Sequence, residues 1–151
     1  MNKKNSIVFR ELRENDITGL LELLTELDDE SKRFFHPHPF DIKTLMDNCK
    51  SKDHYFVMNK NDLIIGYSFL RLFGYKTPSY GCCIRKGYEN KGYGNILTEL
   101  TVKKAKELGY SKIILKTYKE NLSAQKIYIA NGFKTIGETE DKKQYKMELK
   151  L

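Results

Sequence analysis

The sequence predicts an α/β fold in which helices pack on a mixed β-sheet. At 151 residues the chain has the length of one domain with a single hydrophobic core. Its 40% hydrophobic and 31% charged residues are typical of a globular protein and exclude a disordered chain. Strand and helix periodicities follow in the order β-α-α-β-β-β-α-β-α-β-β, with no repeat, linker or low-complexity segment between them. We therefore expect residues 1–151 to form one domain.

The first third of the chain predicts one strand and two helices. Ile7–Arg10 is an apolar strand, and Glu14–Asp16 is the capping region of a helix that runs to about Asp28, where apolar residues recur at helical spacing. Ser31–Asp41 contains two prolines, which favour a loop. A short helix from about Ile42 to Cys49 is expected to follow.

The middle of the chain predicts a hairpin, a third strand and a long helix. The strands Tyr55–Met58 and Leu63–Phe73 flank a polar turn at residues 59–62, which is typical of an antiparallel hairpin. A proline at position 78 precedes the strand Tyr80–Arg85. The long helix begins at Gly92 and Gly94, and a glycine at position 109 ends it as a C-cap.

The last third predicts a buried strand, a helix and a closing hairpin. Lys112–Tyr118 has an apolar centre, and Leu122–Ala130 is a helix that an Asn-Gly pair stops. Phe133–Thr139 and Gln144–Leu149 pair over a charged turn at residues 140–142.

The formal charge of +7 fits either a solvated basic surface or a nucleic-acid surface. The lysines are scattered, and no stripe alternates them with stacking aromatic side chains, so we expect no nucleic-acid partner. A basic surface also steers a polyanionic cofactor toward the protein. The three cysteines lack the spacing of a metal site, and we expect reduced thiols and no metal.

The chain carries no signal for export or for a membrane. Its first five residues are not followed by the apolar run of a signal peptide, and no stretch approaches the ~20 apolar residues of a membrane span. We expect a cytoplasmic protein without a membrane partner. The sequence is compatible with a homodimer and does not decide the oligomeric state.

Residues 88–95 are the most informative segment, because they place Gly92 and Gly94 at the mouth of an amphipathic helix. Such a turn presents unobstructed backbone N–H groups and the positive end of a helix dipole, which together suit a phosphate. A second motif at residues 121–128 puts the hydroxyl of Tyr128 two helical turns beyond the amide of Asn121, on one face of a helix. The two motifs together indicate a pyrophosphate-bearing cofactor and a proton donor beside it.

These residues resemble the GNAT superfamily of acyl-CoA-dependent N-acetyltransferases over nearly the whole chain. The family's pyrophosphate motif is Gln or Arg, two residues, Gly, one residue, then Gly or Ala, and the corresponding segment here is Glu89–Gly94. The family's later Asn-x-x-Ala-x-x-x-Tyr-x-x-x-Gly-Phe pattern is present from Asn121 to Phe133. The resemblance implies an α/β (α+β) fold with a mixed, mostly antiparallel central sheet of about seven strands flanked by about four helices.

The resemblance also implies acetyl-CoA as cosubstrate and an amine as acceptor. The family's pantetheine arm pairs with the strand before the cradle through backbone groups, and the phosphates lie on the glycine turn. The cofactor-binding residues expected from this correspondence are Cys82, Cys83, Ile84, Asn90, Lys91, Gly92, Tyr93, Gly94, Asn95, Asn121 and Tyr128. The alternative role for Asn121 is to cap the start of its helix.

Two positions depart from the family pattern. Glu89 stands where Gln or Arg is usual, and we expect its carboxylate to point away from the phosphates. The strand Tyr80–Arg85 contains no carboxylate, and Lys116 stands where some relatives carry a Glu. The general base is therefore not identified by the motifs.

Three side chains are candidates for catalysis. Tyr128 is the expected general acid for the departing thiolate; its alternative is a tyrosine packed on the sheet. His36 and His38 lie in the loop that lines the acceptor pocket in the family, where a neutral imidazole would accept a proton. The alternative for that loop is a rigid surface turn.

Two functions remain open from the sequence. One is transfer of an acetyl group to an amine of a small molecule or a protein by direct attack in a ternary complex. The other is a non-catalytic acyl-CoA sensor or interaction module of the same fold. Tyr128 favours the enzyme, and the missing carboxylate base favours the module.

Overall fold

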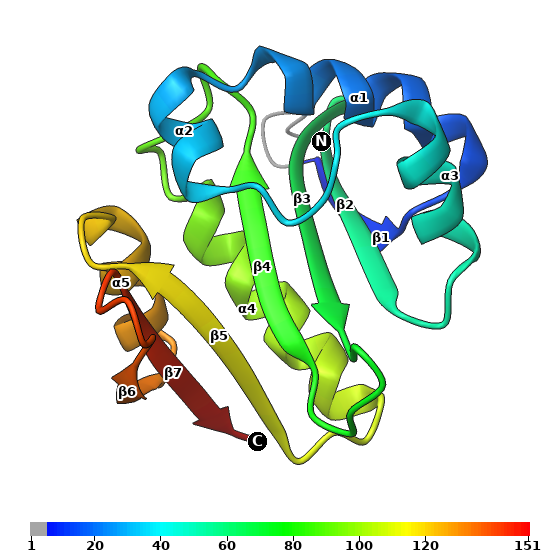
Figure 1. Ribbon diagram of the computed structural model, residues 1–151. Helices are drawn as coiled ribbons and strands as arrows, with labels where there is room; N and C mark the ends of the chain where they lie inside the picture. The colour runs from blue at the N-terminus through cyan, green and yellow to red at the C-terminus, as the bar shows by residue number, and fades with distance from the viewer. Residues whose placement is uncertain (1–5) are drawn as a thin grey trace.

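A seven-stranded sheet with strand order β1-β2-β3-β4-β5-β7-β6 organises the computed structural model, which describes residues 6–151 (Figure 1). Only β4 and β5 run parallel, and every other neighbouring pair is antiparallel. The expected mixed, mostly antiparallel sheet of seven strands is therefore confirmed. The strands are β1 (Ile7–Glu11), β2 (His54–Lys60), β3 (Leu63–Arg71), β4 (Ser79–Ile84), β5 (Lys112–Tyr118), β6 (Lys134–Glu138) and β7 (Gln144–Lys150).

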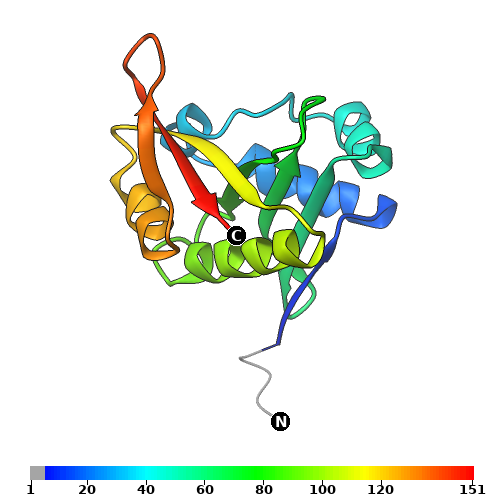
Figure 2. The same ribbon diagram turned by 90° about the horizontal axis from the view of Figure 1, so that it is seen from below.

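Helices cover the two faces of the sheet unequally (Figures 1 and 2). On one face lie α1 (Ile17–Glu26), α2 (Asp29–Phe34) and α3 (Ile42–Lys50), near the N-terminal strands. On the other face lie α4 (Tyr93–Glu107) and α5 (Leu122–Ala130). Because β2 and β3 are covered on both faces, their residues are buried almost continuously, as in the centre of a two-sided sheet.

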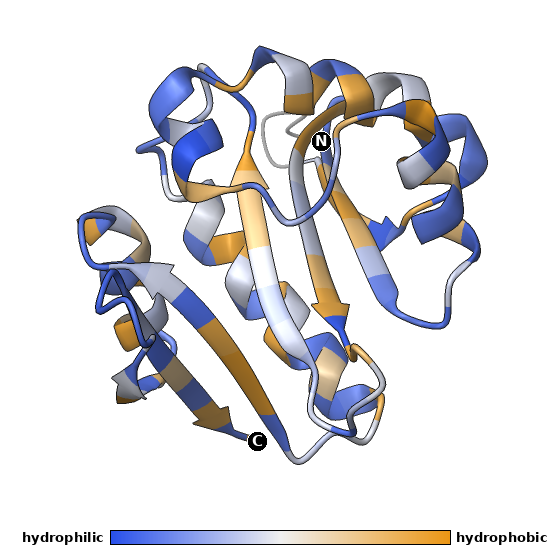
Figure 3. Cartoon of the chain, viewed as in Figure 1, coloured by the Kyte–Doolittle hydropathy of each residue, from blue (hydrophilic) through white to orange (hydrophobic). Residues whose placement is uncertain are grey.

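The C-terminal strands are covered on one face only. Along β5 the buried residues Ile113, Leu115 and Thr117 alternate with Ile114, Lys116 and Tyr118, which are exposed or half-buried. The buried set packs with α4 and α5. Hydropathy bands alternate along β5 and β7 accordingly (Figure 3). One face of this half of the sheet is therefore open to solvent.

The sheet splits between β4 and β5. Their parallel ladder has a single register pair, Ser79 with Ile114, whereas β5 pairs with β7 over seven residues. Beyond Ser79 the two strands diverge toward their carboxyl ends (Figure 1). The edge of β4 that faces β5 therefore has backbone groups without a ladder partner in the described chain.

The structure corrects the predicted loop at Ser31–Asp41. A short helix, α2, occupies its first part, because the side chain of Asp28 caps it by accepting a hydrogen bond from the Ser31 N–H at 2.8 Å. Acidic residues in its first turn and basic residues in its last turn also suit the helix dipole. The described residues thus form five α-helices and one 3₁₀ turn (Glu14–Asp16), where about four helices were expected.

The first hairpin is also tighter than expected. Residues 59 and 60 continue β2, with a register shift after Met58, and the turn consists of Asn61 and Asp62 with φ of 49° and 68°. Two left-handed residues in a two-residue turn match the twist of the flanking strands.

The expectation that the chain begins without a signal peptide concerns residues 1–5, which lie outside the residues that the structure describes. Within residues 6–151, no helix combines the length and the apolar character needed to cross a membrane.

Candidate functional site

The glycine turn before α4 presents a row of free backbone donors. Asn90 and Gly92 adopt left-handed conformations with φ of 59° and 89°. The first N–H after the turn that finds a backbone acceptor belongs to Ile96, which donates to the Gly92 carbonyl at 3.2 Å. Within residues 6–151 the N–H groups of residues 92–95 have no acceptor, so four free donors lie at the positive end of a 15-residue helix. This arrangement suits a phosphate.

The two glycines of the turn serve different purposes. A Cβ on Gly92 would meet no atom within 4 Å, so the space above the donors is open, and the positive φ is what requires glycine there. A Cβ on Gly94 would lie 2.9 Å from Cδ1 of Ile127 in α5. Glycine at position 94 therefore permits the close approach of α4 and α5.

The predicted cradle side chains are not equally free. Lys91 is exposed at the turn. The amide of Asn95 is already committed, because its Nδ2 donates to Glu99 and its Oδ1 accepts a hydrogen bond from Asn131 at 2.9 Å. The contribution that remains to Asn95 is its backbone N–H. Glu89 is half-buried, and burial and the charge of Asp28 both raise its pKa.

A buried pair of hydroxyl groups ties the first turn of α4 to β4. Thr98 Oγ1 donates its single proton to the Gly94 carbonyl at 2.8 Å. Because a hydroxyl has only one proton, the Tyr80 hydroxyl is the donor in its contact with Thr98 Oγ1 at 2.9 Å. Both side chains are almost fully buried. The same arrangement recurs one turn later, where Ser68 donates to Thr101 and Thr101 donates to the Leu97 carbonyl. The first pair holds the peptide group whose N–H faces the open cradle.

Tyr128 lies on α5 with its hydroxyl directed at β4. Its Oη is 3.8 Å from Sγ of Cys82, and its ring makes edge-on contacts with Tyr80 and Phe133. Burial raises the pKa of Tyr128 well above the ordinary value near 10. The hydroxyl is therefore a neutral donor at physiological pH, and a thiol contact is a weak one. Asn121 acts as the N-cap of the same helix, accepting from the Ala124 N–H at 3.3 Å.

The three predicted residues of β4 face different surroundings. Cys82 lies beside Tyr128 on the α4–α5 face, while Cys83 is buried on the opposite face. Ile84 packs with Leu97 near the start of α4. Cys82 and Ile84 direct their backbone groups to the split and can offer them to a ligand, whereas the backbone groups of Cys83 face Tyr67 of β3.

The structure separates the two loop histidines. His36 is exposed, and its Nε2 lies 2.9 Å from the hydroxyl of Tyr118, the last residue of β5. A second bridge joins the same segments, since Arg33 of α2 and Glu120 are 3.1 Å apart. His36 therefore stands at the open end of the split, on the face opposite α4 and α5.

His38 belongs to the aromatic core instead. Its Nδ1 donates to the Pro39 carbonyl at 2.8 Å, and its Nε2 accepts a hydrogen bond from the hydroxyl of the buried Tyr67 at 2.8 Å. Burial lowers the pKa of His38, which favours the neutral ring that this arrangement requires. Both ring nitrogens are thus occupied.

Sequence reasoning missed Tyr80, Thr98 and Tyr118 as members of the site. Each sits inside a correctly predicted element, but their partners lie on other elements. The local signal that could have indicated Thr98 is its position four residues after Gly94 on α4. A threonine hydroxyl at that spacing can donate a hydrogen bond to the Gly94 carbonyl.

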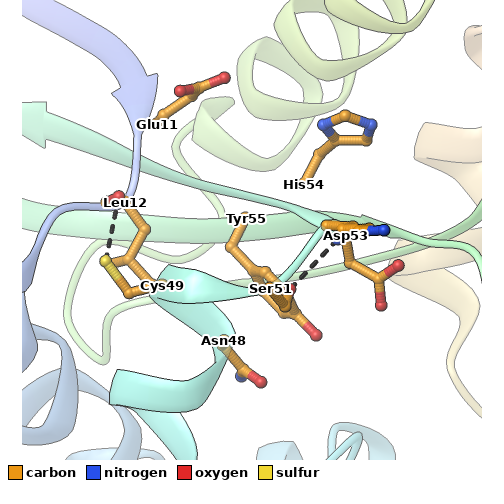
Figure 4. Close-up of a pocket in the computed structure, with 9 residues that line it drawn as sticks. Glu11, Leu12, Asn48, Cys49, Ser51, Asp53, His54 and Tyr55 are labelled. Carbon is orange, nitrogen blue, oxygen red and sulfur yellow. Dashed lines mark hydrogen bonds between the residues drawn. The ribbon is translucent and has the colours of Figure 1, made fainter.

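Two hollows of the molecule lie outside the split. A cavity of about 160 Å³ is formed by the end of β1, the end of α3 and the start of β2 (Figure 4). Within it Cys49 contacts the Leu12 carbonyl and no residue of the cradle takes part. A larger groove runs between β1 and the second half of α4. Neither of these two hollows includes a residue of the split, so the candidate site is defined by β4, β5 and the turn before α4.

Comparison with known proteins agrees with the fold. A family model described as an acetyltransferase (GNAT) domain matches residues 6–134. The ribosomal-protein-S5-alanine acetyltransferase of Vibrio fischeri superposes with a TM-score of 0.83 at 15% identity, over 95% of this chain and 92% of that one. The PaiA N-acetyltransferase of Thermoplasma acidophilum, solved with coenzyme A, gives 0.81 at 18% identity over 97% and 99%. YncA of Salmonella typhimurium, a putative acetyltransferase solved with acetyl-CoA, gives 0.80 at 14% identity over 97% and 95%. No curated protein matches the chain in sequence.

Proposed function

The chain belongs to the GNAT acetyltransferase family, and from this premise we propose that it transfers an acetyl group from acetyl-CoA to an amine. The observation that carries the proposal is the row of unpartnered N–H groups at residues 92–95, which stands on the same face of the sheet as the Tyr128 hydroxyl. Residues 1–151 would act as one domain.

The proposed position of acetyl-CoA follows from these donors. The pyrophosphate would accept the N–H groups of residues 92–95, with Lys91 beside it. The pantetheine arm would pair with the free edge of β4 at Cys82–Ile84. This path brings the thioester toward Tyr128, because Cys82 is the strand residue next to the Tyr128 hydroxyl. The neighbours described with coenzyme A or acetyl-CoA support this ligand.

The chemistry proposed at the split is a direct attack. The neutral amine nitrogen forms a bond to the thioester carbonyl carbon, the C–S bond breaks, and the thiolate leaves. Tyr128 would give its proton to that thiolate. With ordinary pKa values near 10 for tyrosine and 8.5 for a thiol, this donation is uphill by about 2 kcal/mol in water. Burial raises the pKa of the Tyr128 hydroxyl, which by itself disfavours donation. Burial also raises the pKa of the neighbouring Cys82 thiol, and a CoA thiolate placed beside it would be disfavoured in the same way, which would offset the loss.

The amine must lose its own proton before or during the attack. A lysine-like amine with a pKa near 10.4 costs about 4–5 kcal/mol to deprotonate at pH 7. His36 is the proposed acceptor of this proton, because it stands at the open end of the split and its ring is exposed. His38 would hold the loop, since both of its nitrogens are engaged.

A non-catalytic acyl-CoA-binding module is the second candidate. The observation that favours it is that β4 and β5, the two strands bordering the split, contain no Asp or Glu. Such a module would bind acetyl-CoA through the same cradle and would not release free CoA in the presence of an amine.

The cradle is tested by a matched pair of glycine variants. Gly92 and Gly109 stand before and after α4 with the same φ of 89°, and a Cβ on either meets open space. Alanine at either position should therefore cost similar stability, about 1–2 kcal/mol for a left-handed residue. Calorimetry should find weaker CoA binding for Gly92→Ala and unchanged binding for Gly109→Ala. Equal affinity in both variants would remove the phosphates from this turn.

Turnover is tested by the release of free CoA thiol. The wild-type protein and acetyl-CoA are incubated with a panel of amines: amino acids, amino sugars, polyamines and peptides with free N-termini or lysines. Release that depends on an amine supports the enzyme. Tight CoA binding without release for any amine supports the binding module.

A further inference from the structure

Five lysines gather on the open face of the C-terminal strands. The sheet register places them on the side away from α4 and α5, and four of them are exposed. Glu148 is the single carboxylate that these three strands add to the same face. We call this surface the lysine face, and its basic members are Lys112 and Lys116 of β5, Lys134 of β6, and Lys146 and Lys150 of β7.

The lysine face contains two unfavourable pairs. Lys116 stands directly opposite Lys146, and Lys112 stands directly opposite Lys150. Like charges in such cross-strand positions destabilise a sheet. Only Lys112 has partial compensation, from Glu148 at 3.7 Å. Among the described residues, Lys116 and Lys146 have no carboxylate within 4 Å, so folding leaves their repulsion unrelieved.

The lysine face adjoins the proposed acceptor entrance. Lys116 is two residues before Tyr118 on the same face of β5, and Tyr118 contacts His36 at the open end of the split. The opposite face is covered by α4 and α5 and carries the cradle. An acceptor that reaches the split from the uncovered side therefore rests its remaining bulk on the lysine face.

We propose that the lysine face binds an acidic peptide segment adjacent to the amine that is acetylated, so that the acceptor is a protein or peptide with carboxylates near its target nitrogen. This inference rests on the proposed function. Carboxylates of an extended segment recur on one side about every 6.6 Å, which is half of the ~13 Å between Lys112 and Lys116 on their strand. Their binding would relieve the Lys–Lys repulsion that the free protein carries.

A single-stranded nucleic acid fits this face less well. Such ligands stack their bases on aromatic side chains. The central residue of the face is the aliphatic Ile114, and Tyr118 is held by His36. The phosphates of acetyl-CoA belong to the opposite face, where the cradle donors lie.

The test uses Lys146→Glu, which places a carboxylate opposite Lys116. The probe is a fluorescent ten-residue peptide with a free N-terminus and alternating glutamates, and the control peptide replaces every glutamate with serine. Anisotropy is measured with the full chain in the presence of CoA. At low salt the substitution should weaken binding of the acidic peptide by about tenfold, and the difference should shrink at about 0.3 M salt. The serine peptide should bind both proteins alike.

A stability measurement separates binding from folding. Lys146→Glu removes a repulsion, so its melting temperature should be unchanged or higher while its affinity for the acidic peptide falls. Lys106→Glu makes the same change of charge on the exposed side of α4 and should leave peptide binding unchanged. A misfolded variant would instead lose both stability and CoA binding, and Lys116→Glu then replaces it.

The outcomes distinguish this inference from the proposed function. Wild-type protein that binds the two peptides equally, or a Lys106→Glu effect as large as that of Lys146→Glu, overturns the lysine face while CoA binding and amine-dependent CoA release stand. Binding of an oligouridylate is measured in the same way as a further probe. If Lys146→Glu abolishes oligouridylate binding and leaves binding of both peptides unchanged, the lysine face is an RNA surface and the inference is overturned. Failure of the wild-type protein to bind CoA refutes the proposed function by itself.

Discussion

Removing the Thr98 hydroxyl should weaken both the fold and the cradle. Thr98→Val keeps the shape of the side chain but deletes the hydrogen bond to the Gly94 carbonyl at 2.8 Å and the acceptor of the Tyr80 hydroxyl at 2.9 Å. The Tyr80 hydroxyl then remains buried without a partner, which costs about 1–3 kcal/mol. For a chain of this size, each kcal/mol lowers the melting temperature by about 2–4 °C.

The two hydroxyl groups should not act independently. Tyr80→Phe removes the outer donor and leaves Thr98 bonded to Gly94, so it should cost only about 0.5–1.5 kcal/mol. The double variant leaves no unsatisfied group, and its cost should therefore fall below the sum of the two single costs. Urea unfolding of the four proteins measures this difference. An additive double variant would refute the hydrogen-bonded pair.

The effect on ligand binding should be confined to this pair. Looser anchoring of the first turn of α4 should weaken CoA by about 0.5–1 kcal/mol, or two- to fivefold. Ser68→Ala with Thr101→Val deletes the same chemistry one turn further from the cradle. That control should lose stability but keep its CoA affinity in calorimetry. Equal losses of affinity in both sets would mean that the hydroxyl groups act on the fold alone.

Three further predictions concern the proposed chemistry. Tyr128→Phe should lower kcat by about 10²–10⁴ with unchanged CoA affinity, and a fall below tenfold would make Tyr128 a packing residue. His36→Ala should lower kcat or raise the acceptor KM in steady-state assays without affecting CoA binding, and normal turnover would assign the proton to water. His38 has a pKa below the 6.5 of an unfolded histidine, so the unfolded chain binds its proton first and stability should fall as the pH drops below about 6.5. His38→Gln should flatten that dependence in melting curves recorded at pH 8 and pH 5.5, and an unchanged slope would show that other groups cause it.

Local periodicity predicted most of the elements because it reports which face of a segment is buried. Leu122–Ala130 and Lys112–Tyr118 were predicted with the bounds that the structure has. The predicted loop at Ser31–Asp41 is wrong in its first part, because Asp28 caps a helix there that ends before the prolines at 37 and 39. Proline forbids a helix only at and just before its own position, and α2 ends at Phe34.

The candidate site was predictable only where its chemistry is local. Backbone donors at the turn before α4 follow from glycines and a helix start, which are consecutive in the chain. The roles of the histidines are not local. His36 and His38 are two residues apart and equally polar, yet one meets Tyr118 at the surface and the other meets Tyr67 in the core. No spacing rule assigns those partners, because they lie 82 and 29 residues away.

The sequence alone predicted the order of the elements apart from α2, the glycine turn before the long helix and the placement of Tyr128 on a helix, because each depends on neighbours in the chain. The tertiary structure decided where the sheet splits, which side of β5 is open, and that five lysines spread over 39 positions share one surface. These features arise when strands distant in sequence pair in one register. The physical reason is that burial fixes one face of each strand, while strand pairing alone decides which side chains become neighbours on the other.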